Sequence, residues 1–290
     1  MRIAHIIIAH KYPMQLERLV KRLQHPNSDI YIHIDRKTDI TDFQNLSMHP
    51  SVRFVKKRIK VNWGGNSTLL AMTNSLLEAI CINPNYEFIN LVSGQDYPLQ
   101  SAQKLYDFFL KNKGHNFISY DESKESAWWQ AAAARYERYH FTDSSIQGKY
   151  LIQKIINWVF PSRQLPENLQ LHGSSKSAWW TISGECGRYI ASEISSNKSL
   201  IRFLKYCWGT DEFAVASLIM NSKFRHTTIN NNLRYIDWSE GNAHPKLLTI
   251  VDIPMLIQSN ALFARKFDEN TDSGVLDYID EILHTEKDSL

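Results

Sequence analysis

The feature that most constrains the fold is a repeated change of hydrophobic period over the first 120 residues. Residues 3–9 form a nearly continuous apolar run, which is typical of a strand buried on both faces of a parallel sheet. Apolar residues then recur at helical spacing over 14–23, and a second apolar run occupies 30–34. This order predicts a βαβ unit.

Two further strands are predicted over 52–55 and 88–92. The pattern favours an α/β fold with a Rossmann-like, mostly parallel central sheet flanked by helices. In such sheets ligands bind outside the carboxyl ends of the strands, and Asp35 and Asp96 follow the second and fourth strands. No G-x-G-x-x-G follows the first strand, which argues against a nicotinamide dinucleotide.

The remainder of the chain is predicted to complete one domain. Its middle segment is less regular, with helices expected over 131–139 and 152–160, and a later strand is expected over 233–238. Within a single domain spanning 1–290, we expect a nucleotide-binding half over about 1–120, an acceptor and catalytic half over about 121–267, and an acidic C-terminal helix over 268–290.

Charge is unevenly distributed along the chain, which carries a net +3. Residues 268–290 contain eight acids and one base, which leaves 32 basic and 22 acidic residues, or +10, on the rest. A basic body suits an anionic ligand such as a nucleotide diphosphate, or an anionic membrane surface. Nucleic acid is not an expected partner, because no recognised binding motif is present.

The cysteines predict a reducing compartment. Cys81, Cys186 and Cys207 are odd in number, far apart and without a C-x-x-C pair, which favours free thiols, a cytoplasmic location and no structural zinc site. No apolar run approaches the roughly 18 residues of a membrane-spanning helix. The first ten residues favour a buried strand over a signal peptide.

A candidate general base lies in the stretch 205–222. Gly209 ends the preceding element, Thr210 can act as an N-cap, and apolar residues then recur at helical spacing. Asp211 and Glu212 would occupy the first helical turn, where free N–H groups favour an ionised carboxylate. Such a group could accept a proton, although acids also favour first turns for structural reasons alone.

Other candidate side chains follow predicted turns. The Trp63–Gly64 turn could bring backbone close to a ligand, although tight turns need glycine in any case. Lys246, Arg265 and Lys266 are late cations, a type of residue that is often simply solvated. The histidines lack metal-ligand spacing, and no D-x-D occurs to hold a divalent ion on a donor diphosphate. A nucleotide-sugar transferase without this motif would need cationic side chains to offset the charge of the leaving diphosphate.

Six motifs in order carry a resemblance. They are His33-Ile-Asp35, Trp63-Gly-Gly65, Asn90-Leu-Val-Ser-Gly-Gln-Asp-Tyr-Pro98, Lys176-Ser-Ala-Trp-Trp-Thr181, Asp211-Glu212 and Phe263-Ala-Arg-Lys-Phe267. Over about residues 3–267 the chain resembles the core-2/I-branching β-1,6-N-acetylglucosaminyltransferase and peptide O-xylosyltransferase family, as a compact bacterial member.

The resemblance implies a variant glycosyltransferase A-type fold and an inverting, metal-independent transfer from a UDP-sugar. Glu212 matches the catalytic base, and Lys246 and Lys266 match the pair that binds the diphosphate. The expected donor-side residues are Asp35, Trp63, Gly64, Asp96, Lys246, Arg265 and Lys266. The expected acceptor-side residues are Trp179, Trp238, Arg135 and Arg138, the two arginines matching only loosely. No cofactor is expected besides the donor.

Several alternatives stay open. The donor sugar is expected to be N-acetylglucosamine or xylose, with glucose open, and the acceptor a glycan or lipid-linked glycan of a surface polysaccharide. Peripheral association with a membrane is also open. The main alternative is a catalytically inactive module that binds nucleotide-sugar or glycan. A nucleic-acid-binding protein, suggested by the +10 body, is a third.

Overall fold

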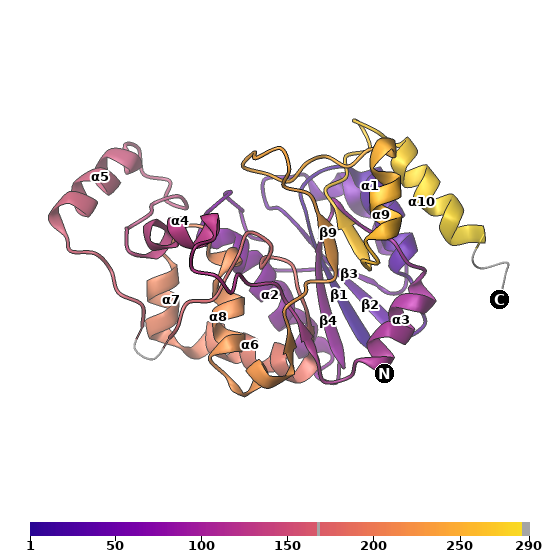
Figure 1. Ribbon diagram of the computed structural model, residues 1–290, viewed down its shortest axis with the longest axis horizontal. Helices are drawn as coiled ribbons and strands as arrows, with labels where there is room; N and C mark the ends of the chain where they lie inside the picture. Colours follow the sequence, from indigo (N-terminus) through magenta and orange to yellow (C-terminus); the bar gives the residue numbers. More distant parts are fainter. Residues whose placement is uncertain (167–168, 286–290) are drawn as a thin grey trace.

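A computed structural model describes residues 1–166 and 169–285 of the chain (Figure 1). Its central sheet has seven strands in the order β3-β2-β1-β4-β7-β6-β8. The first four neighbours run parallel, β7 is antiparallel to both β4 and β6, and β6 is parallel to β8. The predicted mostly parallel sheet is therefore confirmed. The strands span Ile3–Ala9 (β1), Ser28–Ile34 (β2), Val52–Phe54 (β3), Phe88–Ser93 (β4), Asn116–Phe117 (β6), Thr181–Ser183 (β7) and Thr228–Ile229 (β8).

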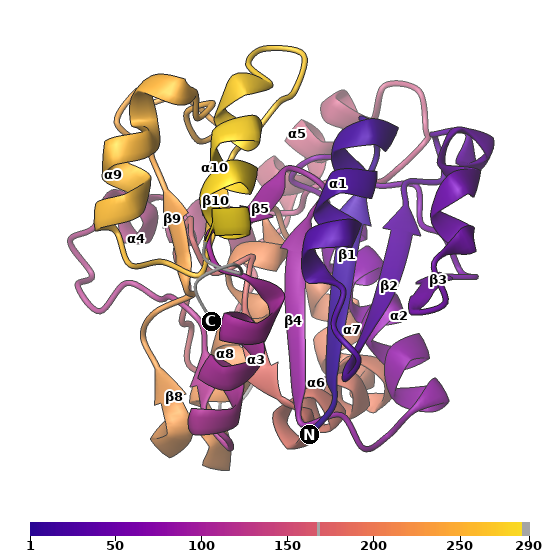
Figure 2. The same ribbon diagram turned by 90° about the vertical axis from the view of Figure 1, so that its right-hand side faces the viewer.

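Helices cover both faces of this sheet, which explains the unbroken apolar runs. Along β1, Ala4 and Ile6 belong to one buried cluster, whereas Ile3 and Ile7 belong to the other. One face carries α1 (Pro13–Leu23), α3 (Ala102–Lys111) and α10 (Gly274–Thr285), and the other carries α2 (Asn66–Ile82), α6 (Gly184–Ser196), α7 (Lys198–Leu204) and α8 (Ala214–Met220) (Figures 1 and 2).

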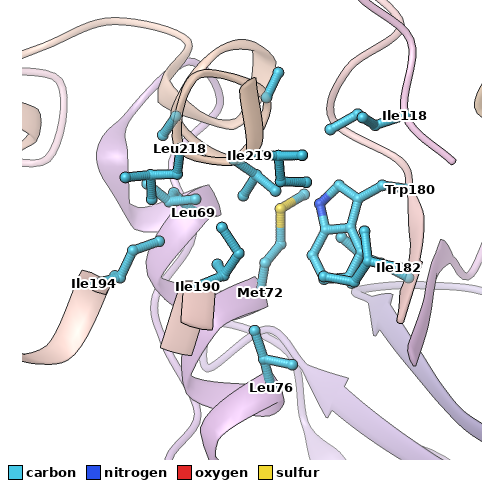
Figure 3. Close-up of a cluster of buried hydrophobic side chains, with 14 of the residues drawn as sticks. Leu69, Met72, Leu76, Ile118, Trp180, Ile182, Ile190, Ile194, Leu218 and Ile219 are labelled. Atoms are coloured by element: carbon cyan, nitrogen blue, oxygen red, sulfur yellow. The ribbon is translucent and has the colours of Figure 1, made fainter. Parts of the chain in front are cut away.

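The cluster on the α2 side closes the joint between the two halves of the chain. In Figure 3, Met72 of α2 lies beside Trp180, while Ile190 of α6 and Ile219 of α8 complete the packing. All four side chains are fully or almost fully buried. Each such side chain contributes roughly 1.5–3 kcal/mol on burial, so this cluster fixes how the second half sits on the first.

A small second sheet has the order β5-β10-β9, with β5 (Asp96–Pro98) antiparallel to β10 (Phe263–Arg265) and β10 parallel to β9 (Arg234–Ile236). It lies beside the end of β4 (Figure 2). Because β5 begins three residues after β4 ends, strand pairing places Arg265 opposite Asp96 at the carboxyl edge of the main sheet.

The acidic C-terminal helix packs against a basic face of α1. Asp280 pairs with Arg18 at 2.6 Å and with Arg22, and Tyr97 donates a hydrogen bond to it at 2.6 Å. Asp277 pairs with Arg18 as well. The charge asymmetry along the sequence is thus partly cancelled in the fold. Residues 286–290 of the predicted helix lie outside the described residues.

The middle segment carries α4 (Ala127–Tyr136) and α5 (Lys149–Val159), and α5 projects from the body of the molecule (Figure 1). α9 (Ile253–Gln258) lies near the C-terminal helix, and short 3-10 helices occupy Ile40–Met48 (η1), Thr210–Glu212 (η2), Lys223–Thr227 (η3) and Ile250–Asp252 (η4). None of the helices in the described part of the chain is long and apolar enough to cross a bilayer.

Candidate active site

A cavity of about 440 Å³ opens at the carboxyl ends of β1, β2 and β4. His10, Asp35 and Gln95 line it from the turns that follow these strands, and Lys266 lines it from the end of β10. The fold therefore gathers here polar residues that are far apart in sequence, at the edge where open α/β sheets bind ligands.

The structure brings together eight of the twelve predicted site residues in this cavity wall. Asp96 lies beneath the wall, Arg135 behind it, and Lys246 and Arg138 are not part of it. The eight residues that line the cavity are Asp35, Trp63, Gly64, Trp179, Glu212, Trp238, Arg265 and Lys266.

The turn that presents Glu212 differs from the prediction. Thr210 is not a helix N-cap: Gly209, in a left-handed conformation at φ 62°, precedes η2, and Phe213 separates η2 from α8. The Thr210 hydroxyl is buried without a hydrogen-bond partner among the described residues. Asp211 and Glu212 therefore lie in a 3-10 turn ahead of the helix. The residue before this turn is glycine because glycine adopts a positive φ without strain.

Two side chains of α4 hold the Glu212 carboxylate. The indole N–H of Trp128 donates a hydrogen bond to Oε2 at 2.7 Å, and the Arg135 guanidinium lies 2.9 Å from the same oxygen. Burial raises the pKa of Glu212, against the opposing effects of Arg135 and Trp128. A carboxylate that is 22% exposed and more basic than a free glutamate is suited to accept a proton.

Arg135 acts from behind this carboxylate. Its guanidinium stacks over Trp208 at 4.6 Å and over Trp128 at 5.5 Å. Gly209 makes room for it, since a Cβ there would lie 2.4 Å from a guanidinium nitrogen. The predicted acceptor-side role of Arg135 stays a prediction; its observed contacts are those of a positioning residue.

Asp211 lines the cavity beside Glu212. Burial, and next the charge of Glu212, raise the pKa of Asp211 to about 7, while Arg135 and Arg265 oppose the rise. Neighbouring carboxyl groups in one site commonly separate in this way into one ionised and one protonated group. The turn therefore offers both a proton acceptor and a proton donor near neutral pH.

Basic side chains from both ends of the chain meet at the strand edge. Arg265 lies 3.5 Å from Asp96 and stacks on Trp179 at 4.5 Å. Asp96 is itself fixed by the Ser93 hydroxyl at 2.6 Å. Burial, and next the nearby Lys11 and Arg265, lower the pKa of Lys266. Like charges held this close favour a bound anion.

Lys246 is engaged elsewhere. Its ammonium lies 2.6 Å from Asp252, six residues along the chain. The preceding His244 and Pro245 do line the cavity. The structure thus brings Lys266, but not the Lys246 side chain, to the cavity that Glu212 lines, and diphosphate binding by Lys246 stays a prediction.

Asp35 and Trp238 each present polar atoms at the wall. Asp35 is 6% exposed, and its carboxylate accepts hydrogen bonds from the Lys37 backbone at 2.9 Å and the Val61 backbone at 3.4 Å. These bonds are those of an aspartate that stabilises a turn, and a role of Asp35 in ligand binding stays a prediction. The indole N–H of Trp238 is buried with no partner among the described residues, so a polar atom of a bound ligand could accept from it.

The Trp63–Gly64 turn rests on another indole. Gly64 has φ 72°, and a Cβ there would lie 2.3 Å from Nε1 of Trp208. The Trp63 ring stands edge-on to Trp208 at 5.3 Å and is 70% exposed. Glycine is needed here both for the left-handed backbone and for the close approach.

Sequence reasoning missed Trp128, Trp208, Lys11 and Lys37. Lys11 and Lys37 line the cavity just after β1 and β2, so their positions at strand ends were an available signal. Trp128 lies 84 residues before Glu212, and no local pattern marks that contact. Among residues 1–166 and 169–285, no group of three or more His, Cys, Asp or Glu side chains could hold a metal ion.

Known proteins resemble the chain along most of its length. Xylosyltransferase oxt of Drosophila pseudoobscura pseudoobscura is 24% identical over 93% of this chain, and human Xylosyltransferase 2 is 24% identical over 98%. The match covers 32% and 34% of those proteins, so the chain spans about a third of their length. Beta-glucuronosyltransferase GlcAT14B of Arabidopsis thaliana is 28% identical over 92% of this chain and 62% of its own.

The solved structure of mouse xyloside xylosyltransferase 1 superposes with a TM-score of 0.41 at 10% identity, covering 90% of this chain and 97% of that one. The profile of the Core-2/I-Branching enzyme family matches residues 3–257, which include the sheet and the turn that carries Glu212. The chain therefore belongs to the Core-2/I-Branching enzyme family.

Proposed function

We propose that this protein is an inverting glycosyltransferase that moves a sugar from a UDP-sugar to a glycan hydroxyl without a metal ion. The observation that carries the proposal is the shared cavity: a partly buried, hydrogen-bonded carboxylate, Glu212, lines the same wall as the cationic pair Arg265 and Lys266. Family membership and the similarity to xylosyl- and glucuronosyltransferases support the transfer of a sugar.

In the proposed reaction the acceptor oxygen attacks the anomeric carbon on the face opposite the UDP. The acceptor O–H proton passes to Glu212, the new carbon–oxygen bond forms, and the bond to the diphosphate breaks with its electron pair leaving on UDP. An α-linked donor thus gives a β-linked product. Arg135 and Trp128 favour the ionised form of Glu212 against the effect of burial, and they orient the carboxylate that takes the proton.

Lys266 and Arg265, with Lys11, offset the charge that develops on the leaving diphosphate. Fixed cations can stabilise such a leaving group as a bound metal ion does elsewhere. Asp35, at the end of β2, would accept hydrogen bonds from the uracil or ribose. Trp63, Trp179 and Trp238 offer aromatic surface for the two sugars.

The substrates beyond this are proposed by kind. We propose N-acetylglucosamine or xylose as the transferred sugar and a glycan of a surface polysaccharide, free or lipid-linked, as the acceptor. The unpaired cysteines support a cytoplasmic setting: Cys186 and Cys207 are buried, Cys81 is exposed, and all three are free. The alternative is an inactive member of the same fold that binds nucleotide-sugar or glycan.

Calorimetric titration of UDP-sugars in the presence of a chelator tests the donor and metal independence together. We expect one UDP-sugar to bind to wild type and to Glu212→Gln alike, because the substitution keeps the shape of the side chain. Transfer by the variant should fall by about 10²–10⁴. Glu185→Gln, an exposed glutamate paired with Lys223, is the matched control and should leave transfer unchanged.

Each contrary outcome identifies a different error. Undiminished transfer by Glu212→Gln would refute the assignment of the base. Binding that requires a divalent ion would refute the cationic leaving-group site. Wild type that binds a UDP-sugar but neither transfers nor hydrolyses it would favour the inactive module.

A further inference from the structure

Helix α5, Lys149–Val159, carries its apolar side chains on the outside of the molecule. None of its residues is buried. Trp158 is 85% exposed, Leu151 65% and Ile155 52%. The adjoining Ile146 and Phe160 are also largely exposed. In a helix of a globular protein this face would normally be turned toward the core.

The polar side chains of α5 face inward instead. Asn157 exchanges two hydrogen bonds with the backbone of Tyr139, at 2.7 and 2.9 Å. Gln153 accepts from the backbone N–H of Phe141 at 2.9 Å, and the Lys149 ammonium donates to the backbone carbonyl of Thr142 at 2.8 Å. These three side chains recur every four residues and form one stripe, so hydrogen bonds hold the helix with its apolar face outward.

The chain on both sides of α5 is bonded to the body of the protein. The Arg163 guanidinium donates to the backbone carbonyl of Tyr206 at 2.9 Å and stacks on Phe203, and the His140 N–H also donates to Tyr206. The outward orientation of the apolar side chains is therefore maintained by hydrogen bonds between α5, its flanking segments and the rest of the protein. Figure 1 shows α5 at the extremity of the molecule opposite α10.

The charges around this face suit an anionic lipid surface. Between residues 143 and 166 the chain has no acid and three basic residues. The Lys149 and Arg163 side chains bond to backbone carbonyls of the protein, whereas Lys154 on the helix is exposed. Tyr150, near the start of the helix, and Trp158, near its end, are both exposed. Aromatic residues of this kind favour the headgroup region of a bilayer, and lysines beside them are attracted by anionic lipids.

A second copy of the chain fits this face less well. The 11 residues of α5 make a helix only about 16 Å long. A stable interface needs roughly 800 Å² per partner, which is more than one face of so short a helix provides. A flat bilayer surface sets no such minimum, because affinity grows with the apolar area inserted and with charge.

We propose that α5 is a membrane-docking helix, which lies in the interface of an anionic bilayer with Leu151, Ile155 and Trp158 inserted among the lipid chains. The docking does not depend on the proposed function. One consequence does. The Ser67 hydroxyl, two residues after the Trp63–Gly65 turn, donates a hydrogen bond at 2.6 Å to Asp143, six residues before α5, so docking would hold the cavity near a lipid-linked acceptor.

Vesicle flotation tests the proposal with the whole protein. We expect wild type to float with vesicles of phosphatidylcholine and phosphatidylglycerol, and much less with phosphatidylcholine alone or at high salt. The double variant L151E/I155E should bind at least about tenfold more weakly, since two inserted side chains become charged. Both positions are exposed, so the fold should be unaffected; circular dichroism and UDP-sugar binding verify that it is retained.

The matched control is M48E/V251E, which changes two apolar residues that are each 76% exposed on η1 and η4. It should float as wild type does. Wild type that fails to float with anionic vesicles, or L151E/I155E that floats as well as wild type, would overturn the proposal. So would a dimer, measured by light scattering without lipid, that L151E/I155E dissociates, because the face would then belong to a second copy.

Discussion

The hydrogen bond from Trp128 to Glu212 can be removed without changing the base itself. In Trp128→Phe an aromatic ring remains in the buried site, but the N–H that lies 2.7 Å from Oε2 is lost. A hydrogen bond to a charged partner contributes about 1.5–3 kcal/mol, and 1.4 kcal/mol corresponds to a factor of ten. Loss of the bond disfavours the ionised carboxylate by this amount.

The sign of the effect on the pH dependence follows from the proposed role of Glu212 as the catalytic base. Glu212 must be ionised to accept a proton, so activity rises with pH through the pKa of Glu212, which burial already holds above the ordinary glutamate value. Trp128→Phe raises the pKa of Glu212 further. The acid limb of kcat/KM should move to higher pH, and activity below that limb should fall about tenfold or more, while activity well above it largely recovers.

Trp129→Phe is the matched control. It makes the same change on the next residue of α4, where the indole N–H donates to the backbone carbonyl of Asp121 at 3.0 Å. The measurement is kcat/KM for transfer from pH 4.5 to 9 for wild type and both variants. An acid limb that stays in place in Trp128→Phe, or that moves equally in Trp129→Phe, would refute the reasoning that this bond tunes the base.

Three further outcomes are expected. Lys266→Ala should lower kcat/KM by about 10–100-fold through loss of a charged contact to the donor, measured by donor titration, whereas Lys246→Ala should change it by less than about fivefold. Burial raises the pKa of Asp211 from 3.8 to about 7, so folding takes up a proton between these pH values and stability falls as pH rises through them. Asp211→Asn should therefore stabilise the protein, by up to about 4 kcal/mol at pH 8 and by little at pH 4, in urea unfolding. Gly64→Ala and Gly148→Ala both strain a left-handed backbone, but Gly64→Ala also meets an indole at 2.3 Å and should lose about 1–3 kcal/mol more in the same assay.

The strands of the main sheet and their polar ends were predictable because they obey local rules. Buried parallel strands need continuous apolar runs, and 3–9, 30–34 and 88–92 have them. The topology of such a sheet brings polar residues at strand ends to one edge, and Asp35 lies there in the cavity wall, while its role in ligand binding stays a prediction. The pattern after Gly209 likewise located Glu212, although its 3-10 turn was not predicted because the left-handed Gly209 and the break at Phe213 are set by tertiary packing.

What could not be predicted depends on long-range or loop contacts. Lys246 has the residue type expected of a diphosphate ligand, but its partner Asp252 is fixed by a capping box at Thr249 that the sequence alone did not reveal. The Glu212–Arg135 pair joins segments 77 residues apart, in a part of the chain with weak periodicity. A helix was predicted over 152–160, close to α5, but the outward orientation of its apolar side chains follows only from the hydrogen bonds of its polar stripe.

Arg265 and Glu212, on two sides of the cavity, are positioned by different elements of the fold. Substitutions near one should therefore have different effects from substitutions near the other. Arg265 is positioned by strand pairing, since β10 and β5 set it against Asp96. Glu212 is positioned by side chains of α4. Gly173 packs against both partners, since a Cβ added there would lie 2.5 Å from the Trp128 ring and from the Glu212 backbone carbonyl. Changes in the small sheet should therefore alter donor KM, and changes around α4 should alter kcat and its pH dependence. A substitution at Asp96 that moved the acid limb without weakening donor binding would show that the two sides of the cavity are coupled.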